Sequence, residues 1–326
     1  MTKARAIVLN GFGGAEVMQL ETLDLPAPGA GEVLVAQSAI GFNYIDVYQR
    51  SGVYPLPTPT GLGHEAAGTV EAIGPGVERV AVGDRVAYMN AGLGAYADKR
   101  IVPAEKLVKI PDGISDEAAA ALLFKGMTAQ YLLRKTHVVR PDELVIVHAA
   151  AGGVGQILSG WAKALGAFVV GTAGSPEKCA IALKAGCDIA IDYAKPDWVA
   201  ALLAATGGRK ARVVYDSVGK TTFLQSLDLT APFGLVVSYG AASGPAPEIS
   251  MDLLNKKGCL YVTRPSVFPH NADPATFRAN AAELFAAIAS GAVKPEIGAR
   301  FKLADVVAAH RAAEARATVG AILITP

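Results

Sequence analysis

The chain has 326 residues, of which 52% are hydrophobic and 18% are charged, and its net charge is +1. This composition excludes a disordered chain, and the balanced charge argues against nucleic acid as the main ligand. No apolar run reaches the roughly 20 residues of a membrane span, and residues 1–10 lack a signal-peptide core. Three scattered cysteines favour a reducing compartment, so we expect a cytoplasmic protein.

The first 120 residues predict a compact, β-rich and possibly barrel-like domain. Short β-type runs alternate there with turns rich in glycine and proline, such as Pro26–Gly29 and Gly74–Gly76. The expected strands are Arg5–Leu9, Glu32–Ile40, Ala67–Ile73, Arg85–Met89 and Lys99–Val102.

From Lys125 onward, strands alternate with helices, which predicts a doubly wound parallel sheet. Two helices are expected around this boundary, at Ser115–Leu123 and Thr128–Arg134. The six expected strands are Leu144–His148, Phe168–Thr172, Ile189–Ile191, Arg212–Asp216, Leu235–Tyr239 and Leu260–Thr263. A helix at Pro274–Ser290 follows, and Arg311–Thr325 should hold a further helix and a last strand at Ala321–Ile324. The central domain is thus expected to be inserted in a second domain built from both ends of the chain.

Residues 144–172 are typical of a dinucleotide-binding unit. A strand leads into a turn of small residues, and a helix and a second strand follow. The turn matches the G-x-G-x-x-G pattern at Gly152 and Gly155, with Ala150 at the first position. Such a turn lets backbone N–H groups and the positive end of a helix approach a pyrophosphate. An ordinary tight turn without a ligand is the alternative.

The end of the second strand favours NADPH over NADH. NAD enzymes carry an acid there for the ribose 2′-hydroxyl, whereas this chain reads Thr172–Ser175 without one. Lys178 follows and offers a cation to a 2′-phosphate. Ser175 can bind the phosphate or simply cap a helix, Lys178 can be an ordinary surface lysine, and Glu177 is an acid nearby.

Several local motifs together resemble one family, the zeta-crystallin-like NADPH:quinone oxidoreductases of the medium-chain dehydrogenase/reductase superfamily. The motifs are Gly41–Asp46, Gly61–Gly68, Gly83–Val86, Ala149–Gly155, Val214–Gly219 and Tyr261–Pro265. The resemblance implies a GroES-like catalytic domain over residues 1–124 and 265–326, a Rossmann domain that binds NADPH over residues 125–264, and commonly a homodimer. We expect the dimer to form through the edge of the sixth strand, Leu260–Thr263.

The resemblance also bears on zinc. Zinc members of the superfamily place cysteines where this chain has Asn43 and near Lys125, and they carry a four-cysteine lobe after Asp84 that is missing here. Only His64 and Glu65 remain of such a site, and His64 is more easily read as a packed residue. We therefore expect no metal.

Hydride transfer to a conjugated carbonyl develops charge on an oxygen, which needs a donor. The candidate catalytic residues are Asn43, Tyr48 and Tyr54, although Tyr48 can equally be core packing. Asp46 can hold the Asn43 loop or cap a helix, and Lys125 is implied to hold the cofactor ribose. The expected cofactor-binding set is completed by Thr128, Gly152, Gly153, Val154, Gly155, Gly174, Ser175, Lys178, Tyr193, Ser217, Tyr239, Gly240, Arg264 and Arg316.

The expected function is zinc-independent reduction of a small-molecule quinone by NADPH. One alternative is an NADPH-dependent reductase of enone or alkenal double bonds. Another is a crystallin-like or RNA-binding protein that uses the fold without catalysis.

Overall fold

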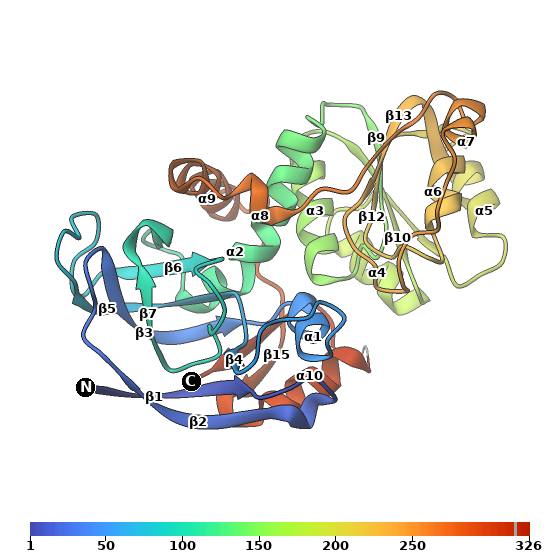
Figure 1. Cartoon of the computed structure of the whole chain (residues 1–326). Helices are drawn as coiled ribbons and strands as arrows, with labels where there is room; N and C mark the ends of the chain where they lie inside the picture. Colours follow the sequence, from blue (N-terminus) through green and yellow to red (C-terminus); the bar gives the residue numbers. More distant parts are fainter. Residues whose placement is uncertain (316–317) are drawn as a thin grey trace. The chain divides into compact units, whose positions relative to one another are not determined.

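The computed structural model describes residues 1–315 and 318–326 and divides into two compact units (Figure 1). Unit 1 comprises Met1–Met127, Asn271–Ala289 and Pro295–Pro326, and unit 2 comprises Thr128–His270 and Ser290–Lys294. The domain boundaries expected at residues 124/125 and 264/265 stay predictions. No helix in the described residues is both long and apolar enough to span a membrane.

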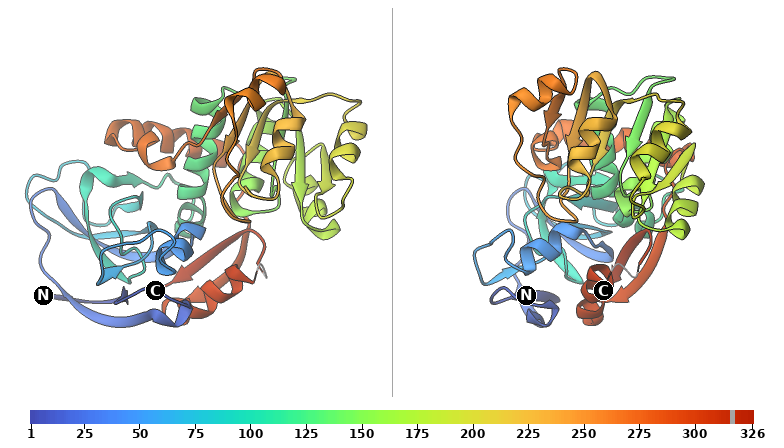
Figure 2. Two further views of the ribbon diagram at one scale, coloured as in Figure 1. Left: turned by 45° about the vertical axis from the view of Figure 1, so that its right-hand side comes forward. Right: turned by 90° about the vertical axis from the view of Figure 1, so that its right-hand side faces the viewer.

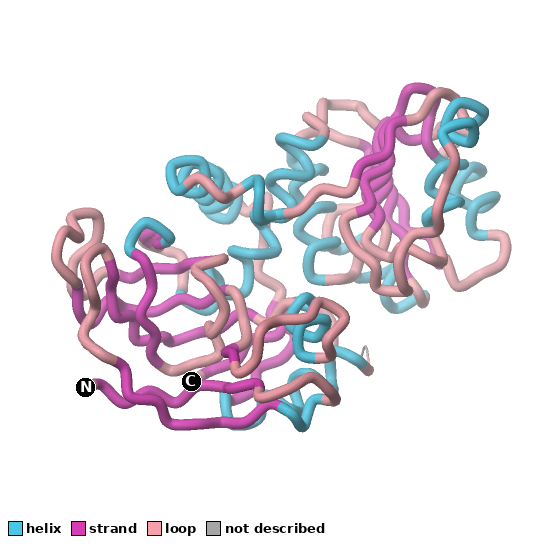
Figure 3. The backbone as a smooth tube through the Cα atoms, viewed as in Figure 1, coloured by secondary structure: helices cyan, strands magenta, loops and turns pink. Residues whose placement is uncertain are grey.

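Unit 1 is built mainly from β-strands, as the short β-type runs predicted (Figure 3). Its strands are β1 (Thr2–Leu9), β2 (Met18–Leu25), β3 (Glu32–Gly41), β4 (Thr60–Gly61), β5 (Glu65–Ile73), β6 (Arg85–Met89), β7 (Lys99–Pro103), β8 (Leu107–Lys109), β15 (Ile297–Lys302) and β16 (Ala321–Thr325). Its helices are α1 (Tyr44–Arg50), α9 (Pro274–Ala289) and α10 (Val306–Glu314), together with most of α2 (Asp116–Tyr131). Short 3₁₀ turns lie at Ala15–Val17, Ala104–Lys106 and Leu303–Asp305.

Two sheets enclose the core of unit 1. A larger sheet has the strand order β15-β16-β3-β5-β6-β8, with β7 also paired to β3, and a smaller sheet has the order β2-β1-β4. The long strand β3 pairs antiparallel with β5, β7 and β16, so it forms the centre of the larger sheet. The buried side chains include Ile7, Val35, Ile40, Leu62 and Tyr96. This core holds the start of α1, where the candidate catalytic residues lie.

Unit 2 contains a six-stranded parallel sheet with the order β11-β10-β9-β12-β13-β14. Counted along the chain, this is the order 3-2-1-4-5-6 of the Rossmann fold, as predicted. The strands are β9 (Leu144–Val147), β10 (Phe168–Ala173), β11 (Ile189–Asp192), β12 (Ala211–Asp216), β13 (Thr230–Ser238) and β14 (Tyr261–Thr263). The helices are α3 (Gly153–Ala164), α4 (Pro176–Lys184), α5 (Trp198–Ala205), α6 (Phe223–Leu229), α7 (Met251–Lys256) and α8 (Val267–His270). Within this unit α3 and α4 lie on one face of the sheet and α5 and α6 on the other (Figures 1 and 2).

The structure corrects several expected elements. The two helices expected at Ser115–Leu123 and Thr128–Arg134 are one helix, α2, which continues as a π-turn over Leu132–Thr136. Lys125–Gly126 interrupts the helical pattern, but glycine costs a helix only about 1 kcal/mol. At Gly126, a Cβ atom would lie 2.5 Å from Leu284 Cδ1, so the bare backbone lets α9 pack closely there.

Four strands and one helix position were also missed. The last described helix is α10, at Val306–Glu314, whereas a helix was expected within Arg311–Thr325. Strands β2 and β15 contain at most one fully buried side chain each and no continuous apolar run, and they were not predicted. Strands β4 and β8, of two and three residues, were not predicted either.

Candidate active site

The glycine turn in unit 2 has the form that a pyrophosphate requires. After β9 the chain turns at Ala149, whose φ is 52°, and the Ala150 N–H donates to the Thr172 carbonyl at 2.9 Å. Gly152 then precedes the first turn of α3, where the N–H groups of Gly153 and Val154 have no partner within the helix. A Cβ atom at Gly155 would lie 2.2 Å from the Ala149 oxygen. Only glycine therefore allows this close turn, and the helix N-terminus stays open to an anion.

A buried polar network lies beneath this turn and was not predicted from the sequence. His148 pairs with the Thr172 hydroxyl at 2.7 Å and with the Ser226 hydroxyl at 3.0 Å. Burial lowers the pKa of His148, and the nearby Asp216 carboxylate opposes that shift. Ser226 donates in turn to Asp216 at 2.8 Å. The network therefore joins the ends of β9, β10 and β12 to α6.

Asp216 also shapes the chain after β12. Its Oδ1 atom accepts the N–H groups of Val218 at 2.8 Å and Gly219 at 2.9 Å. Both oxygens accept the Thr222 hydroxyl at 2.9 Å. The carboxylate thereby holds the loop that contains Ser217. In the sequence this loop is marked by the end of the Val214–Gly219 motif.

At the end of β10, Ser175 is the N-cap of α4, and its hydroxyl accepts the Lys178 N–H at 3.3 Å. The capping alternative for Ser175 is therefore present in the structure. The Lys178 ammonium makes no hydrogen bond or ion pair with any described residue, which leaves its charge available. Gly174 lies next to Tyr193, whose hydroxyl would be 3.4 Å from a Cβ atom at position 174. Asp192 accepts the Ala194 N–H at 3.0 Å in its own turn.

Four more expected cofactor residues gather at the carboxyl ends of β12, β13 and β14. The Tyr239 N–H donates to the Asp216 carbonyl at 2.8 Å, and a Cβ atom at Gly240 would lie 2.6 Å from the Ser217 oxygen. Arg264 donates to the Ser238 carbonyl at 3.4 Å. Ligands bind at this edge of such sheets, so the place of these residues suits a cofactor.

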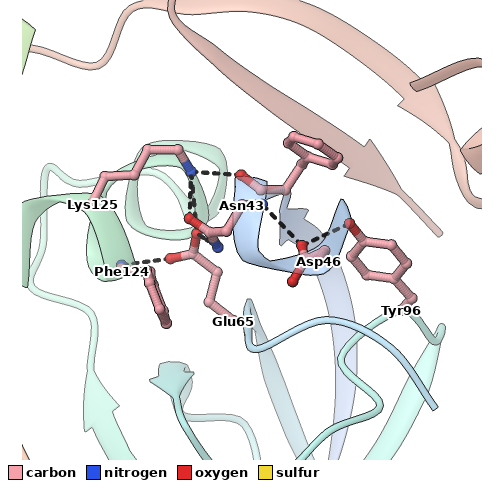
Figure 4. Close-up of polar contacts among 7 residues, drawn as sticks. Asn43, Asp46, Glu65, Tyr96, Phe124 and Lys125 are labelled. Atoms are coloured by element: carbon pink, nitrogen blue, oxygen red, sulfur yellow. Dashed lines mark hydrogen bonds and ion pairs between the residues drawn. The ribbon is translucent and has the colours of Figure 1, made fainter. Parts of the chain in front are cut away.

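In unit 1, Asn43 is the N-cap of α1 and is held from two sides (Figure 4). Its N–H donates to Asp46 Oδ2 at 2.9 Å, which forms half of a capping box. Its side-chain amide donates to Glu65 Oε1 at 2.7 Å. Both alternatives for Asp46 therefore describe one arrangement, in which capping the helix also holds the Asn43 loop.

Lys125 and Glu65 form a buried ion pair at Asn43 (Figure 4). The Lys125 ammonium donates to the Phe42 carbonyl at 2.8 Å, to Asn43 Oδ1 at 3.2 Å and to Glu65 Oε1 at 3.3 Å. Glu65 Oε2 accepts the Phe124 N–H at 2.6 Å. Burial raises the pKa of Glu65 and Lys125 opposes that rise. Since all three partners of Glu65 donate, the geometry favours its ionised form.

A second buried cluster supports Asp46. Tyr96 donates to Asp46 Oδ2 at 2.8 Å and lies 3.3 Å from His310 Nε2. Burial raises the pKa of Asp46 to about 7 and, together with Arg50, lowers the pKa of His310 to about 3. Asp46 is completely buried, and it is joined to the candidate site by its hydrogen bond with the Asn43 N–H.

The candidate tyrosines form an aromatic surface beside Asn43. Tyr48 makes edge-to-face contacts with Tyr44, at a centroid distance of 5.2 Å, and with Tyr54, at 5.3 Å. Tyr44 and Tyr54 are exposed and Tyr48 is half-buried, so Tyr48 does not belong to the buried core. Tyr44 was not among the predicted residues.

His64 is packed inside unit 1, as the simpler interpretation predicted. Its ring pairs with Gln49 Oε1 at 2.9 Å, and burial lowers its pKa to about 4. In the described part of the chain, no three His, Cys, Asp or Glu side chains are grouped so as to hold a metal ion. The absence of zinc stays a prediction.

The remaining expected residues are Thr128 and Arg316. Thr128 is buried on α2. Arg316 lies outside the described residues. Glu65 is the main residue that sequence reasoning missed, since we considered it only as part of a lost zinc site, although the Gly-His-Glu motif contains it.

Comparison with known proteins agrees with this geometry. Residues 29–112 match the alcohol dehydrogenase GroES-like domain, and residues 153–286 match the zinc-binding dehydrogenase model. A quinone oxidoreductase of Pseudomonas aeruginosa is 47% identical, with 99% of this chain and 100% of that protein covered. A 2-haloacrylate reductase of Burkholderia is 40% identical, with 98% of each covered.

Among solved structures, Escherichia coli quinone oxidoreductase complexed with NADPH superposes with a TM-score of 0.95 at 45% identity, covering 99% of this chain and 100% of that one. These similarities extend over both units, as the sequence motifs predicted. The chain therefore belongs to the zeta-crystallin-like quinone oxidoreductase family of the medium-chain dehydrogenase/reductase superfamily.

Proposed function

We propose that this protein is an NADPH-dependent quinone reductase. The observation that carries the proposal is the nucleotide site of unit 2. It combines an open turn at Gly152–Gly155 with the carboxyl end of β10, where Thr172–Ser175 contain no acidic residue. Whole-length relatives named quinone oxidoreductases support it, as does a relative solved in complex with NADPH. The same relatives count against a crystallin-like or RNA-binding protein without catalysis.

The residues of unit 2 fit NADPH. Backbone N–H groups at Gly153 and Val154 would hold the pyrophosphate at the positive end of α3. The free ammonium of Lys178 would pair with the 2′-phosphate, and Ser175 would keep that part of the chain in place as a helix cap. When bound, NADPH supplies the hydride from its nicotinamide ring.

In unit 1, Asn43, Tyr48 and Tyr54 would bind and polarise the acceptor. Hydride addition leaves negative charge on a quinone oxygen, and hydroxyl or amide donors stabilise that charge. The buried Lys125–Glu65 pair fixes the orientation of the Asn43 amide, because Lys125 bonds its oxygen and Glu65 bonds its nitrogen. Aromatic faces on Tyr44 and Tyr48 suit a flat ring.

A double-bond reductase is the second candidate, favoured by the 2-haloacrylate reductase relative. The test is NADPH oxidation with a panel of quinones, enones, alkenals and 2-haloacrylate. We expect the highest kcat/KM for quinones. A higher kcat/KM for 2-haloacrylate or an enone would replace the proposal by its alternative, and no oxidation with any acceptor would refute both.

The protein is further proposed to be a cytoplasmic homodimer. Strand β14 pairs only with β13 among the described strands, and Tyr261 on it is 63% exposed. Phe233 and Met251, on β13 and α7, are also exposed. Pairing two copies of β14 across a two-fold axis would satisfy the free edge. Light scattering should give the dimer mass for the wild type. Tyr261→Pro should yield monomers or misfolded protein, since proline removes a backbone donor. A monomeric wild type at micromolar concentration would refute the dimer.

A further inference from the structure

Unit 1 contains a cavity of about 600 Å³ that shares no lining residue with the candidate active site. It lies between α9 and the segments around β8. Its floor is apolar and is formed by buried side chains, among them Val80, Leu107, Ile114 and Phe285. The volume is within the range of about 300–1,000 Å³ that is typical of small-molecule sites.

One face of α9 forms a wall of this cavity. The lining positions recur every three or four residues, which is the spacing of a single helix face. Ala282, Ala286 and Ala289 lie on this face and are exposed, so these three positions offer only methyl groups to the cavity. The small side chains leave space beside Phe285 and Arg278, which lie on the same helix and also line the cavity.

Three cations surround the apolar floor. Arg79, Lys109 and Arg278 line the cavity against a single carboxylate, that of Asp112. Lys109 is already paired with Asp84 at 2.7 Å, and one nitrogen of Arg278 donates to the Glu105 carbonyl at 3.3 Å.

Arg79 makes no hydrogen bond or ion pair with any described residue, and Arg278 has further donors available. The charge at the cavity is therefore complementary to an anion, and the floor is complementary to an apolar chain.

We propose that this cavity binds a free single-chain amphiphile with an anionic head, such as a medium-chain carboxylate. The chain would cover Val80 and Phe285, and the head would pair with Arg79 and Arg278. The inference does not depend on the proposed reductase activity, because none of these residues belongs to the candidate active site.

The test is calorimetric titration of the full-length protein with decanoate below its critical micelle concentration, and with decyltrimethylammonium in parallel. We expect one decanoate per chain, bound at least tenfold more tightly than the cation. Ala282→Trp fills the cavity and should weaken decanoate binding at least tenfold. Ala279→Trp is the matched control, since Ala279 is an exposed alanine on the same helix that does not line the cavity.

Charge is tested separately with Arg79→Glu, which should weaken decanoate binding at least fivefold, with Lys302→Glu as an exposed control. Unchanged thermal unfolding of each variant would show that the fold is retained. Equal affinity of the Ala282→Trp and Ala279→Trp variants would overturn the proposal. Equal affinities for decanoate and decyltrimethylammonium would also overturn it. Binding to phosphatidylglycerol vesicles without binding of decanoate would overturn it as well, because the positive charge would then belong to a site for a lipid surface.

Discussion

Replacing Glu65 by Gln should destabilise unit 1 strongly, because the buried Lys125 ammonium would lose its counter-charge. The side chains of Lys125 and Glu65 are only 9% and 0% exposed. Breaking such a buried pair from one side costs about 3–5 kcal/mol. A glutamine also carries an NH₂ group, which must face either the Phe124 N–H or the two donors Asn43 and Lys125. At least one buried hydrogen bond is therefore lost as well.

The assay is urea unfolding followed by circular dichroism, analysed for the transition of each compact unit. Glu71→Gln is the matched control, because Glu71 pairs with Lys99 at 2.7 Å with side chains that are 37% and 32% exposed. That exposed pair should contribute only about 0.2–1 kcal/mol. The double variant Glu65→Gln, Lys125→Met removes both charges and should recover at least about 1 kcal/mol relative to additivity.

Equal costs for Glu65→Gln and Glu71→Gln would refute the reasoning, since the buried pair would then behave like a surface pair. Strict additivity in the double variant would refute it as well.

Four further outcomes are expected. Lys178→Ala should weaken binding of NADPH much more than binding of NADH, by about 1.5–3 kcal/mol for a lost charge-assisted contact. Lys184→Ala is the control on the same helix, and fluorescence titration showing equal losses for both cofactors would contradict this assignment. Tyr48→Phe should lower kcat with quinones less than about tenfold, which corresponds to roughly 1.4 kcal/mol in the activation free energy. The effect is small because the hydroquinone anion is already stabilised. A loss near 10²-fold in steady-state kinetics would indicate an essential donor. Since burial raises the pKa of Asp46 to about 7 from an ordinary 3.8, the folded state retains a proton that the unfolded state has lost. The stability contributed by this group should therefore be present below pH 4 and be lost as the pH rises to about 7. Asp46→Asn should remove that part of the pH dependence of unfolding. An unchanged pH profile in this variant would show that Asp46 is not the titrating group. Metal analysis should find no stoichiometric zinc, and chelators should leave the rate of NADPH oxidation unchanged. One zinc per chain, with activity lost on its removal, would show that the protein is a zinc-dependent dehydrogenase.

Local patterns in the sequence were sufficient for the Rossmann sheet and for the glycine turn. Six apolar runs between helical segments lead to a parallel sheet, and the small residues at Ala149–Gly155 allow a close turn. These features depend on neighbouring residues, so the sequence contains them directly. Strands β2 and β15 were missed because neither contains an apolar run like those of the Rossmann strands.

The candidate site in unit 1 depended on the tertiary structure. Asn43, Glu65 and Lys125 are far apart in the chain, and nothing in their spacing shows that an ammonium, a carboxylate and an amide meet in the core. The raised pKa of Asp46 likewise follows from burial, and the Lys178 ammonium is unpaired among the residues that the structure describes. Residue types and local spacing thus determined the fold class and the cofactor turn. Only long-range packing decided which polar groups are buried together, because burial and pairing are set by segments that are distant in the sequence.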